Sequence, residues 1–256
     1  MTPVLAFDIE TIPDVSGIRR LHELPADLPD REVAEIAFQR RRTQTGSDFL
    51  PPQLQRVVVI SCVMRGDDGV RVFSLEGSEA EMIQRFYDGI EKYVPQLVSW
   101  NGGGFDLPVL NYRGLIHGVS APMFWETGDE NRDFRYNNYV SRYHSRHTDL
   151  MDVLAMYQPR NNAPLDDVAQ LAGLPGKIGV GGAKVWETYL AGDIAAIRDY
   201  CEADTANTYL LYLRYQLLRG AMIRDVFEKE KSVLKTHLKT LDKPHWREFL
   251  KLWNDS

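Results

Sequence analysis

Two carboxylates stand two positions apart in the first apolar segment of the chain. Asp8 and Glu10 follow the apolar run at residues 4–7. Alternate residues of a β-strand point to the same face, so a strand here would present both carboxylates on one side. Adjacent buried carboxylates repel one another, and a divalent cation removes that cost. The pair therefore predicts a metal site. A second Asp-x-Glu, Asp30 and Glu32, is interpreted as acids in the first turn of a helix.

A third acid lies in the segment Asn101-Gly-Gly-Gly-Phe105-Asp106. Glycines after a strand allow the backbone to turn sharply and to come close to a ligand. Asp106 then stands where a helix should begin, and its alternative interpretation is an ordinary helix N-cap. The residues alone leave both interpretations open.

Tyr200 and Asp204 are four positions apart in a long segment with helical periodicity. This spacing places the phenol and the carboxylate on one face of a helix. Tyr189 and Asp193 repeat the spacing, but Gly192 interrupts them at an expected helix start, so Asp193 is interpreted as a cap. The alternative interpretation of Tyr200 is a helical tyrosine that packs in the core without a role in chemistry.

Alternating strands and helices would position these groups. Apolar runs predict a buried strand at residues 4–10, a hairpin of residues 57–64 and 70–75, and a short strand at residues 96–100. A capping box at Ser78 predicts the start of an amphipathic helix. Further helices are expected at residues 31–42, 107–118, 148–157, 165–174, 192–218 and 224–240, with an irregular stretch at residues 121–147 and an aromatic tail after the last helix. The order indicates an α/β layered fold.

Composition excludes several classes of protein. The chain has 256 residues, 44% of them hydrophobic and 26% charged, which is typical of a globular protein. Two cysteines cannot form a disulfide framework or a cysteine-rich zinc site, and they fit a reduced cytoplasm. The longest apolar run, at residues 57–64, is too short to span a membrane, and the first ten residues do not have the pattern of a signal peptide. A net charge of −6 argues mildly against nonspecific coating of nucleic acid. We therefore expect a cytoplasmic protein without a membrane partner.

The segments FDIET, NGGGFD and YCEAD together closely resemble the three motifs of the DEDDy branch of the DnaQ-like 3′–5′ exonucleases. The middle segment is most similar to that of the exonuclease domain of family B DNA polymerases. The resemblance covers residues 2–215. It implies a ribonuclease H-like fold, a five-stranded mixed sheet with the first strand central and helices on both sides. We expect an exonuclease domain at residues 1–220 and a C-terminal helical extension at residues 221–256. The remaining length leaves no room for a polymerase domain.

The resemblance also implies the roles of individual residues. The four metal-binding and catalytic acids would be Asp8, Glu10, Asp106 and Asp204, with Tyr200 as the fifth catalytic residue. Oxygen-only ligands select hard cations, so the implied cofactors are two Mg²⁺ or Mn²⁺ ions. Asp8 would bridge both ions, Glu10 and Asp204 would hold the ion that activates water, and Asp106 would support the other ion mainly through water. The substrate-binding residues would be Thr11, Asn101 and Phe105.

The leading hypothesis is a metal-dependent 3′–5′ exonuclease that acts on the 3′ ends of single-stranded DNA or RNA, with DNA favoured. It would release nucleoside 5′-monophosphates by a two-metal-ion mechanism. The first alternative is a 3′–5′ exoribonuclease similar to RNase D. The second alternative is a non-catalytic nucleic-acid-binding protein, which predicts the loss of at least one metal acid. All four acids and the tyrosine are present.

Three other groups of residues have both a functional and a structural interpretation. Aromatic and arginine side chains at residues 123–147 suit a single strand, but a small core under a long loop is favoured for most of the aromatics. His144 and His147 with Asp149 form a weak zinc pattern and are more often structural; Asp149 is an alternative supporting residue. Four lysines at residues 229–239 are interpreted as a solvated helix face.

Overall fold

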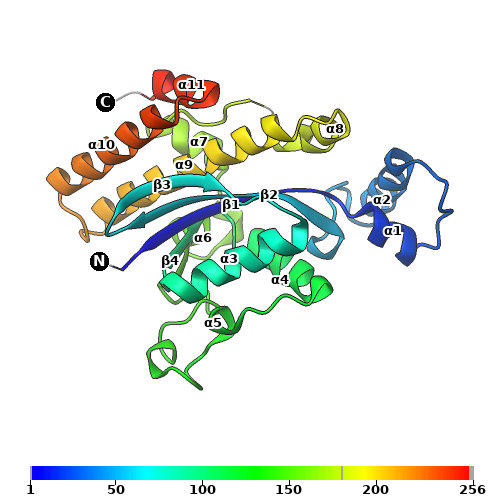
Figure 1. The fold of residues 1–256 in the computed structure, drawn as a ribbon, viewed down its shortest axis with the longest axis horizontal. Coiled ribbons are helices and arrows are strands. Elements are labelled where there is room, and N and C mark those ends of the chain that lie inside the picture. The colour runs from blue at the N-terminus through cyan, green and yellow to red at the C-terminus, as the bar shows by residue number, and fades with distance from the viewer. Residues whose placement is uncertain (1, 180, 254–256) are drawn as a thin grey trace.

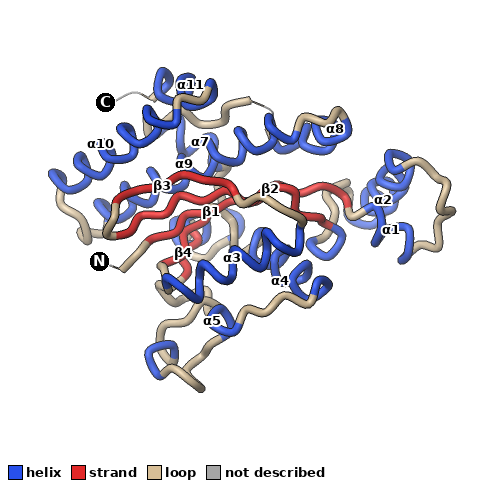
Figure 2. The backbone as a smooth tube through the Cα atoms, viewed as in Figure 1, coloured by secondary structure: helices blue, strands red, loops and turns tan. Residues whose placement is uncertain are grey.

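A single five-stranded mixed sheet forms the centre of the protein. The computed structural model describes residues 2–179 and 181–253. Met1, Val180 and residues 254–256, which belong to the exonuclease domain and the C-terminal extension predicted above, lie outside the described residues. The strands are β1 (Val4–Pro13), β2 (Gln55–Gly66), β3 (Gly69–Ser74), β4 (Gln96–Ser99) and β5 (His147–Asp149), and their order in the sheet is β3-β2-β1-β4-β5. β1 is central, antiparallel to β2 and parallel to β4, and helices cover both faces (Figures 1 and 2). The α/β fold predicted from the sequence is confirmed.

The two faces of β1 belong to different hydrophobic layers. Val4 and Ala6 pack in the layer that contains α9 (Ile194–Leu218), whereas Leu5, Phe7 and Ile9 pack in the layer that contains α3 (Glu79–Tyr93). This is the period-two alternation of a strand that is buried on both sides. The same alternation assigns Asp8 and Glu10 to the α9 side.

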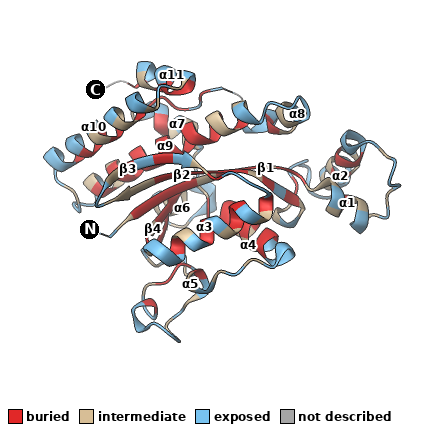
Figure 3. Cartoon of the chain, in the orientation of Figure 1, coloured by how far each residue is buried: buried red, intermediate tan, exposed pale blue. Residues whose placement is uncertain are grey.

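Helix α9 is the main element on that side of the sheet. Sixteen of its residues are buried, because the sheet, α7 (Leu165–Leu171), α10 (Arg224–Leu241) and α11 (Pro244–Leu252) surround it (Figures 1 and 3). Trp246 and Phe249 of α11 are fully buried in the same hydrophobic cluster as the α9 residues. A helix enclosed in this way cannot rotate without repacking several neighbours.

The opposite side of the sheet carries α3, α4 (Asp106–His117) and α5 (Pro122–Trp125). The predicted capping box is present at the start of α3, where Ser78 and Glu81 hydrogen-bond to each other's backbone amides. Helices α1 (Val15–Leu21) and α2 (Asp30–Thr45) pack together beyond the end of β1 (Figure 1). Asp30 and Glu32 lie in the first turn of α2, so their interpretation as first-turn acids is confirmed.

Two predictions differ from the structure, one for residues 148–157 and one for the aromatic tail. Residues 147–149 form β5, which the helical interpretation of residues 148–157 missed, and α6 (Leu150–Leu154) is only five residues long. Met156 and Tyr157 have left-handed φ angles of 53° and 60°, which end any continuation of that helix. The aromatic tail is the helix α11, because its aromatic residues recur at helical spacing and face α9 and α10.

The segment at residues 123–147 divides into a buried part and an exposed part. Phe124, Phe134 and Tyr139 join the α3 layer, which confirms the small-core interpretation for these three. Tyr136 and Tyr143 are exposed. Lys231 of α10 is buried beside Glu228, so the prediction of a fully solvated lysine face is wrong at that position. Within residues 2–179 and 181–253, no helix combines the length and the apolar character that a membrane span requires.

Candidate active site

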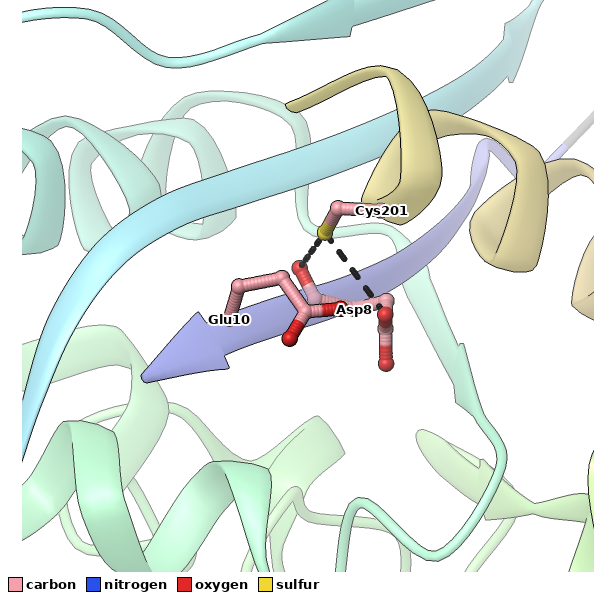
Figure 4. Close-up of side chains that lie close together, drawn as sticks. All are labelled: Asp8, Glu10 and Cys201. Atoms are coloured by element: carbon pink, nitrogen blue, oxygen red, sulfur yellow. Dashed lines mark hydrogen bonds between the residues drawn. The ribbon is translucent and has the colours of Figure 1, made fainter. Parts of the chain in front are cut away.

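Asp8 and Glu10 project from β1 toward α9 and lie next to each other (Figure 4). Their carboxylate oxygens and the Cys201 thiol of α9 all lie within 4.8 Å of one another. Asp8 is half-buried and Glu10 is buried. Burial raises the pKa of Asp8 well above its usual value, and the negative charges of Asp106, Glu10 and Asp204 raise it further. The pKa of Glu10 is raised in the same way, first by burial and then by the charges of Asp204 and Asp106.

Asp106 reaches this pair because β1 continues past the end of β4. The pairing between the two strands stops at Ala6, which leaves the next part of β1 without a strand partner on that edge. The Ile9 amide, which lies in this part, donates a hydrogen bond of 3.1 Å to Asp106 Oδ1. Phe105 is the N-cap of α4 and Asp106 is its first residue, so the interpretation of Asp106 as an ordinary N-cap is wrong. Burial raises the Asp106 pKa to about 7.

The loop that delivers Asp106 is held by Asp149. Asp149 accepts hydrogen bonds of 2.9 Å from the backbone amides of Asn101 and Gly103, and it also caps α6. Asn101 has a φ of 65°, a left-handed conformation that asparagine tolerates better than most residues. A Cβ atom at Gly103 would lie 3.2 Å from Asp149 Oδ2, so a side chain there would press on the carboxylate that holds the loop.

Tyr200 and Asp204 face the same space from one side of α9. The Asp204 pKa is raised to about 6 by burial, and a hydrogen bond with the Tyr200 side chain opposes that increase. Asp204 Oδ1 is buried and has no hydrogen-bond partner among the described residues. Burial raises the pKa of Tyr200, and the charges of Asp204, Glu10 and Asp8 raise it further, so the phenol keeps its proton at neutral pH. Asp193 is the N-cap of α9, which confirms its interpretation as a cap rather than a partner of Tyr189.

A groove of about 610 Å³ adjoins these carboxylates. Glu10, Thr11 and Phe105 are part of its wall, and Phe49 and Trp186 add exposed or half-exposed aromatic surface. Phe49 and Phe105 pack with their ring centres 5.2 Å apart. Asn101 is not part of this wall, and the Thr11 hydroxyl donates to Gln55 Oε1 at 3.0 Å.

Sequence reasoning missed the contributions of Lys177, Cys201 and the two groove aromatics. Lys177 lies close enough to Glu10 and Asp204 for its positive charge to lower the pKa of both. Cys201 could have been identified because it lies three residues before Asp204 on α9, a spacing that makes their side chains neighbours on the helix surface. Lys177, Phe49 and Trp186 carry no local signal, because their positions depend on how distant segments pack.

The two histidines near Asp149 have protein partners. His147 Nε2 lies 2.8 Å from Ser99 Oγ, and burial lowers the His147 pKa to about 4. His144 Nδ1 accepts a hydrogen bond of 3.0 Å from the Asn138 amide. These contacts favour the structural interpretation of both side chains over the zinc site.

The residues present fit a pair of hard divalent cations. All four acids offer oxygen donors, each has a pKa raised by burial or by neighbouring negative charge, and one of the buried oxygens lacks any partner among the described residues. Bound cations would neutralise the clustered charges and satisfy that oxygen.

Comparisons with known proteins show the family to which the chain belongs. Residues 47–253 match a family model described as a predicted 3′–5′ exonuclease related to the exonuclease domain of PolB. The chain is 26% identical over 228 residues to the catalytic subunit of DNA polymerase epsilon from Aspergillus fumigatus, and 27% identical over 230 residues to the same protein from Emericella nidulans. Each match covers 83% of this chain and 9% of the relative, so the chain spans about a tenth of the length of these polymerases.

A solved structure shares the fold. The family B DNA polymerase of the hyperthermophilic archaeon Pyrobaculum calidifontis superimposes with a TM-score of 0.50 and 22% identity, over 85% of this chain and 25% of the polymerase chain. The fold is therefore the ribonuclease H-like fold of polymerase exonuclease domains, as the sequence predicted. Since the family model matches most of the chain, this protein belongs to the family of predicted 3′–5′ exonucleases related to the exonuclease domain of PolB.

Proposed function

We propose that the protein is a metal-dependent 3′–5′ exonuclease that hydrolyses the terminal phosphodiester bond of single-stranded nucleic acid, with DNA favoured, and releases nucleoside 5′-monophosphates. The observation that carries this proposal is the convergence of Asp8, Glu10, Asp106 and Asp204 around the middle of the central strand β1, next to a buried tyrosine. Mutual repulsion of these carboxylates has no value for folding, so a bound cation is the simplest reason for the arrangement.

The four acids would hold two Mg²⁺ or Mn²⁺ ions. When bound, such ions supply the positive charge that stabilises the attacking and leaving oxygens of a phosphodiester displacement. The charges of all three other acids raise the Asp8 pKa, which supports a central position for Asp8 among the four carboxylates that would hold the ions. The hydrogen bond from the Ile9 amide fixes the Asp106 carboxylate beside Asp8 and Glu10, where it would support a bound ion.

Tyr200 and Lys177 would complete the chemistry. Because the Tyr200 phenol stays protonated, it can donate a hydrogen bond that orients the attacking water, but it cannot act as a general base at neutral pH. Lys177 would place an ammonium near a phosphate oxygen at the reacting end. Both residues act by orientation and charge, which are the main contributions of protein side chains to phosphoryl transfer.

The aromatic groove would bind the 3′ end. Bases stack on exposed aromatic rings, and this contact is tolerant of sequence. Phe49, Phe105 and Trp186 provide such rings beside Glu10. Thr11 and Asn101 stay substrate-binding candidates by virtue of their positions next to the acids. The two relatives support the proposed preference for DNA, because both are DNA polymerases.

A digestion time course tests the proposal. Single-stranded DNA and RNA oligomers labelled at the 5′ end are incubated with Mg²⁺, Mn²⁺ or EDTA. We expect a ladder that shortens from the 3′ end, requires the cation and is faster for DNA; faster digestion of RNA would favour the exoribonuclease instead. Asp8→Asn should abolish the ladder. Asp30→Asn is the matched control, because Asp30 belongs to the other Asp-x-Glu pair, on α2. Digestion by Asp8→Asn at the wild-type rate would refute the proposal.

A further inference from the structure

A buried polar cluster joins α9 to the C-terminal helix α11. Glu202 of α9 is 2% exposed. Its carboxylate accepts hydrogen bonds from Lys243 Nζ at 3.0 and 3.1 Å, and its Oε2 lies 2.9 Å from His245 Nε2. Asp199, one turn earlier on α9, lies 3.2 Å from His245 Nδ1. Since the Lys243 ammonium already supplies the positive charge, this cluster needs no metal ion.

The same carboxylate continues into the sheet. Ser74 Oγ of β3 donates to Glu202 Oε1 at 3.0 Å, and Ser61 Oγ of β2 lies 2.9 Å from Ser74 Oγ. Ser61 pairs with Asp8 across the β1–β2 ladder, and its hydroxyl lies close enough to Cys201 to oppose the increase that burial causes in the pKa of the thiol. Ser61 and Cys201 are completely buried, so water does not compete for these contacts.

Cys201 completes the connection to the candidate active site. Its thiol lies 3.5 Å from the backbone oxygen of Asp8 and 3.6 Å from Asp8 Oδ2 (Figure 4). A continuous series of polar contacts therefore runs from α11 through Glu202, Ser74, Ser61 and Cys201 to Asp8.

The position of Glu202 on α9 couples this series of contacts to the rotation of the helix about its axis. Successive residues of an α-helix are rotated by about 100°, so Glu202 projects from the side of α9 opposite Tyr200 and Asp204. Any rotation of α9 about its axis that moves Glu202 away from Lys243 and Ser74 also moves Asp204 relative to Asp8. Close packing already restrains α9, but apolar contacts have little directional preference, whereas the hydrogen bonds with Lys243, His245 and Ser74 select one rotation angle.

We infer that Glu202 is a positioning residue that uses α11 and β3 to fix the rotation of α9, and thereby the placement of Asp204 and Asp8 for metal binding. The inference rests on the proposed function, because it takes metal binding at the candidate active site as the reason why Asp204 and Asp8 must be held in place. A buried ion pair alone is weak support for stability, since well-packed apolar residues would serve equally well. The connection to Asp8 distinguishes this cluster from a purely structural pair.

Glu230 provides a matched control. It forms a buried ion pair with Arg65, at 2.7 and 2.9 Å, and it also contacts α9 through Tyr209. It comes from the same C-terminal part of the chain as Lys243 but has no series of contacts leading to the acids among the described residues. Glu202→Gln and Glu230→Gln should therefore cost similar stability and differ only in their effect on the site.

The test compares these two variants with the wild type in Mn²⁺ binding without nucleic acid, measured by electron paramagnetic resonance, and in kcat and KM. We expect Glu202→Gln to weaken Mn²⁺ binding and to lower kcat by about 10-fold, with KM for the oligomer unchanged, as is usual for residues that orient metal ligands. Glu230→Gln should bind Mn²⁺ like the wild type. Ser74→Ala removes one contact at less cost to folding and should show a smaller loss in the same direction.

The inference is overturned if Glu202→Gln and Ser74→Ala bind Mn²⁺ as the wild type does, or if Glu230→Gln loses as much affinity as Glu202→Gln. The outcome is separate from that of the proposed function. A wild-type protein that binds Mn²⁺ but digests no oligomer would contradict the exonuclease, and the binding data would still decide the role of Glu202.

Discussion

Replacing Asp204 with asparagine should stabilise the metal-free protein at alkaline pH while it abolishes nuclease activity. An unfolded aspartate has a pKa near 3.9, and the folded Asp204 pKa is about 6. The folded state therefore binds more protons than the unfolded chain between these values, and its stability falls as pH rises through this window. Above pH 6 the ionised carboxylate costs about 3 kcal/mol of unfolding free energy.

Asparagine keeps the shape of the side chain and removes the charge. Its amide N–H would replace an oxygen that has no hydrogen-bond partner among the described residues, which costs about 1 kcal/mol for an unsatisfied donor. The variant should therefore be about 2 kcal/mol more stable than the wild type at pH 8 in EDTA. The difference should disappear, and then reverse, as pH falls toward 4, where the wild-type carboxyl is neutral.

Urea unfolding in EDTA at several pH values measures this difference. Asp193→Asn is the control, because it changes an aspartate of the same helix at its N-cap, where asparagine serves equally well. Mn²⁺ should raise the stability of the wild type, since it binds only the folded state, and should stabilise Asp204→Asn much less. A variant that is less stable than the wild type at pH 8 in EDTA, or a difference independent of pH, would refute the reasoning.

Four other perturbations give distinct expectations. Tyr200→Phe should lower kcat by about 100-fold with little change in KM, whereas Tyr189→Phe, which removes the hydroxyl from the other Tyr-x-x-x-Asp, should have wild-type kinetics; equal effects would remove Tyr200 from the mechanism. Asp149→Ala releases the loop that carries Asp106 and should cost about 2 kcal/mol in urea unfolding and reduce kcat; unchanged kcat would show that the loop holds itself. Trp186→Ala should raise KM for a single strand by about 10-fold through lost stacking, and an unchanged KM would place the substrate outside the groove. Lys177→Met should lower kcat/KM and raise the pH at which activity appears, because its charge no longer lowers the pKa of Glu10; an unchanged pH profile would contradict this.

The placement of Asp8, Glu10, Tyr200 and Asp204 could be predicted because each pair lies within one regular element. The periods of a strand and a helix decide which side chains share a face. β5 could not be predicted in this way, since its residues His-Thr-Asp have no apolar alternation and pair only because β4 provides an edge.

The remaining parts of the site depend on contacts between distant segments. The residues around Asp106 fit either a cap or a metal acid, and the choice is made by the unpaired Ile9 amide, which exists because β4 is shorter than β1. Lys177 lies in a loop and approaches Glu10 only through the packing of that loop beside α9. No local pattern contains this information.

The pairing of β1 with β2 places Asp8 opposite Ser61 and Glu10 opposite Val59. A slip of one residue along that ladder would exchange the two faces of the strand, sending both acids among the phenylalanines of the α3 layer and Phe7 toward α9. No intermediate alignment exists between these two outcomes. Mutations can therefore adjust the side chains around this strand by degrees, whereas a one-residue change in its alignment with β2 would remove the acidic centre in a single step.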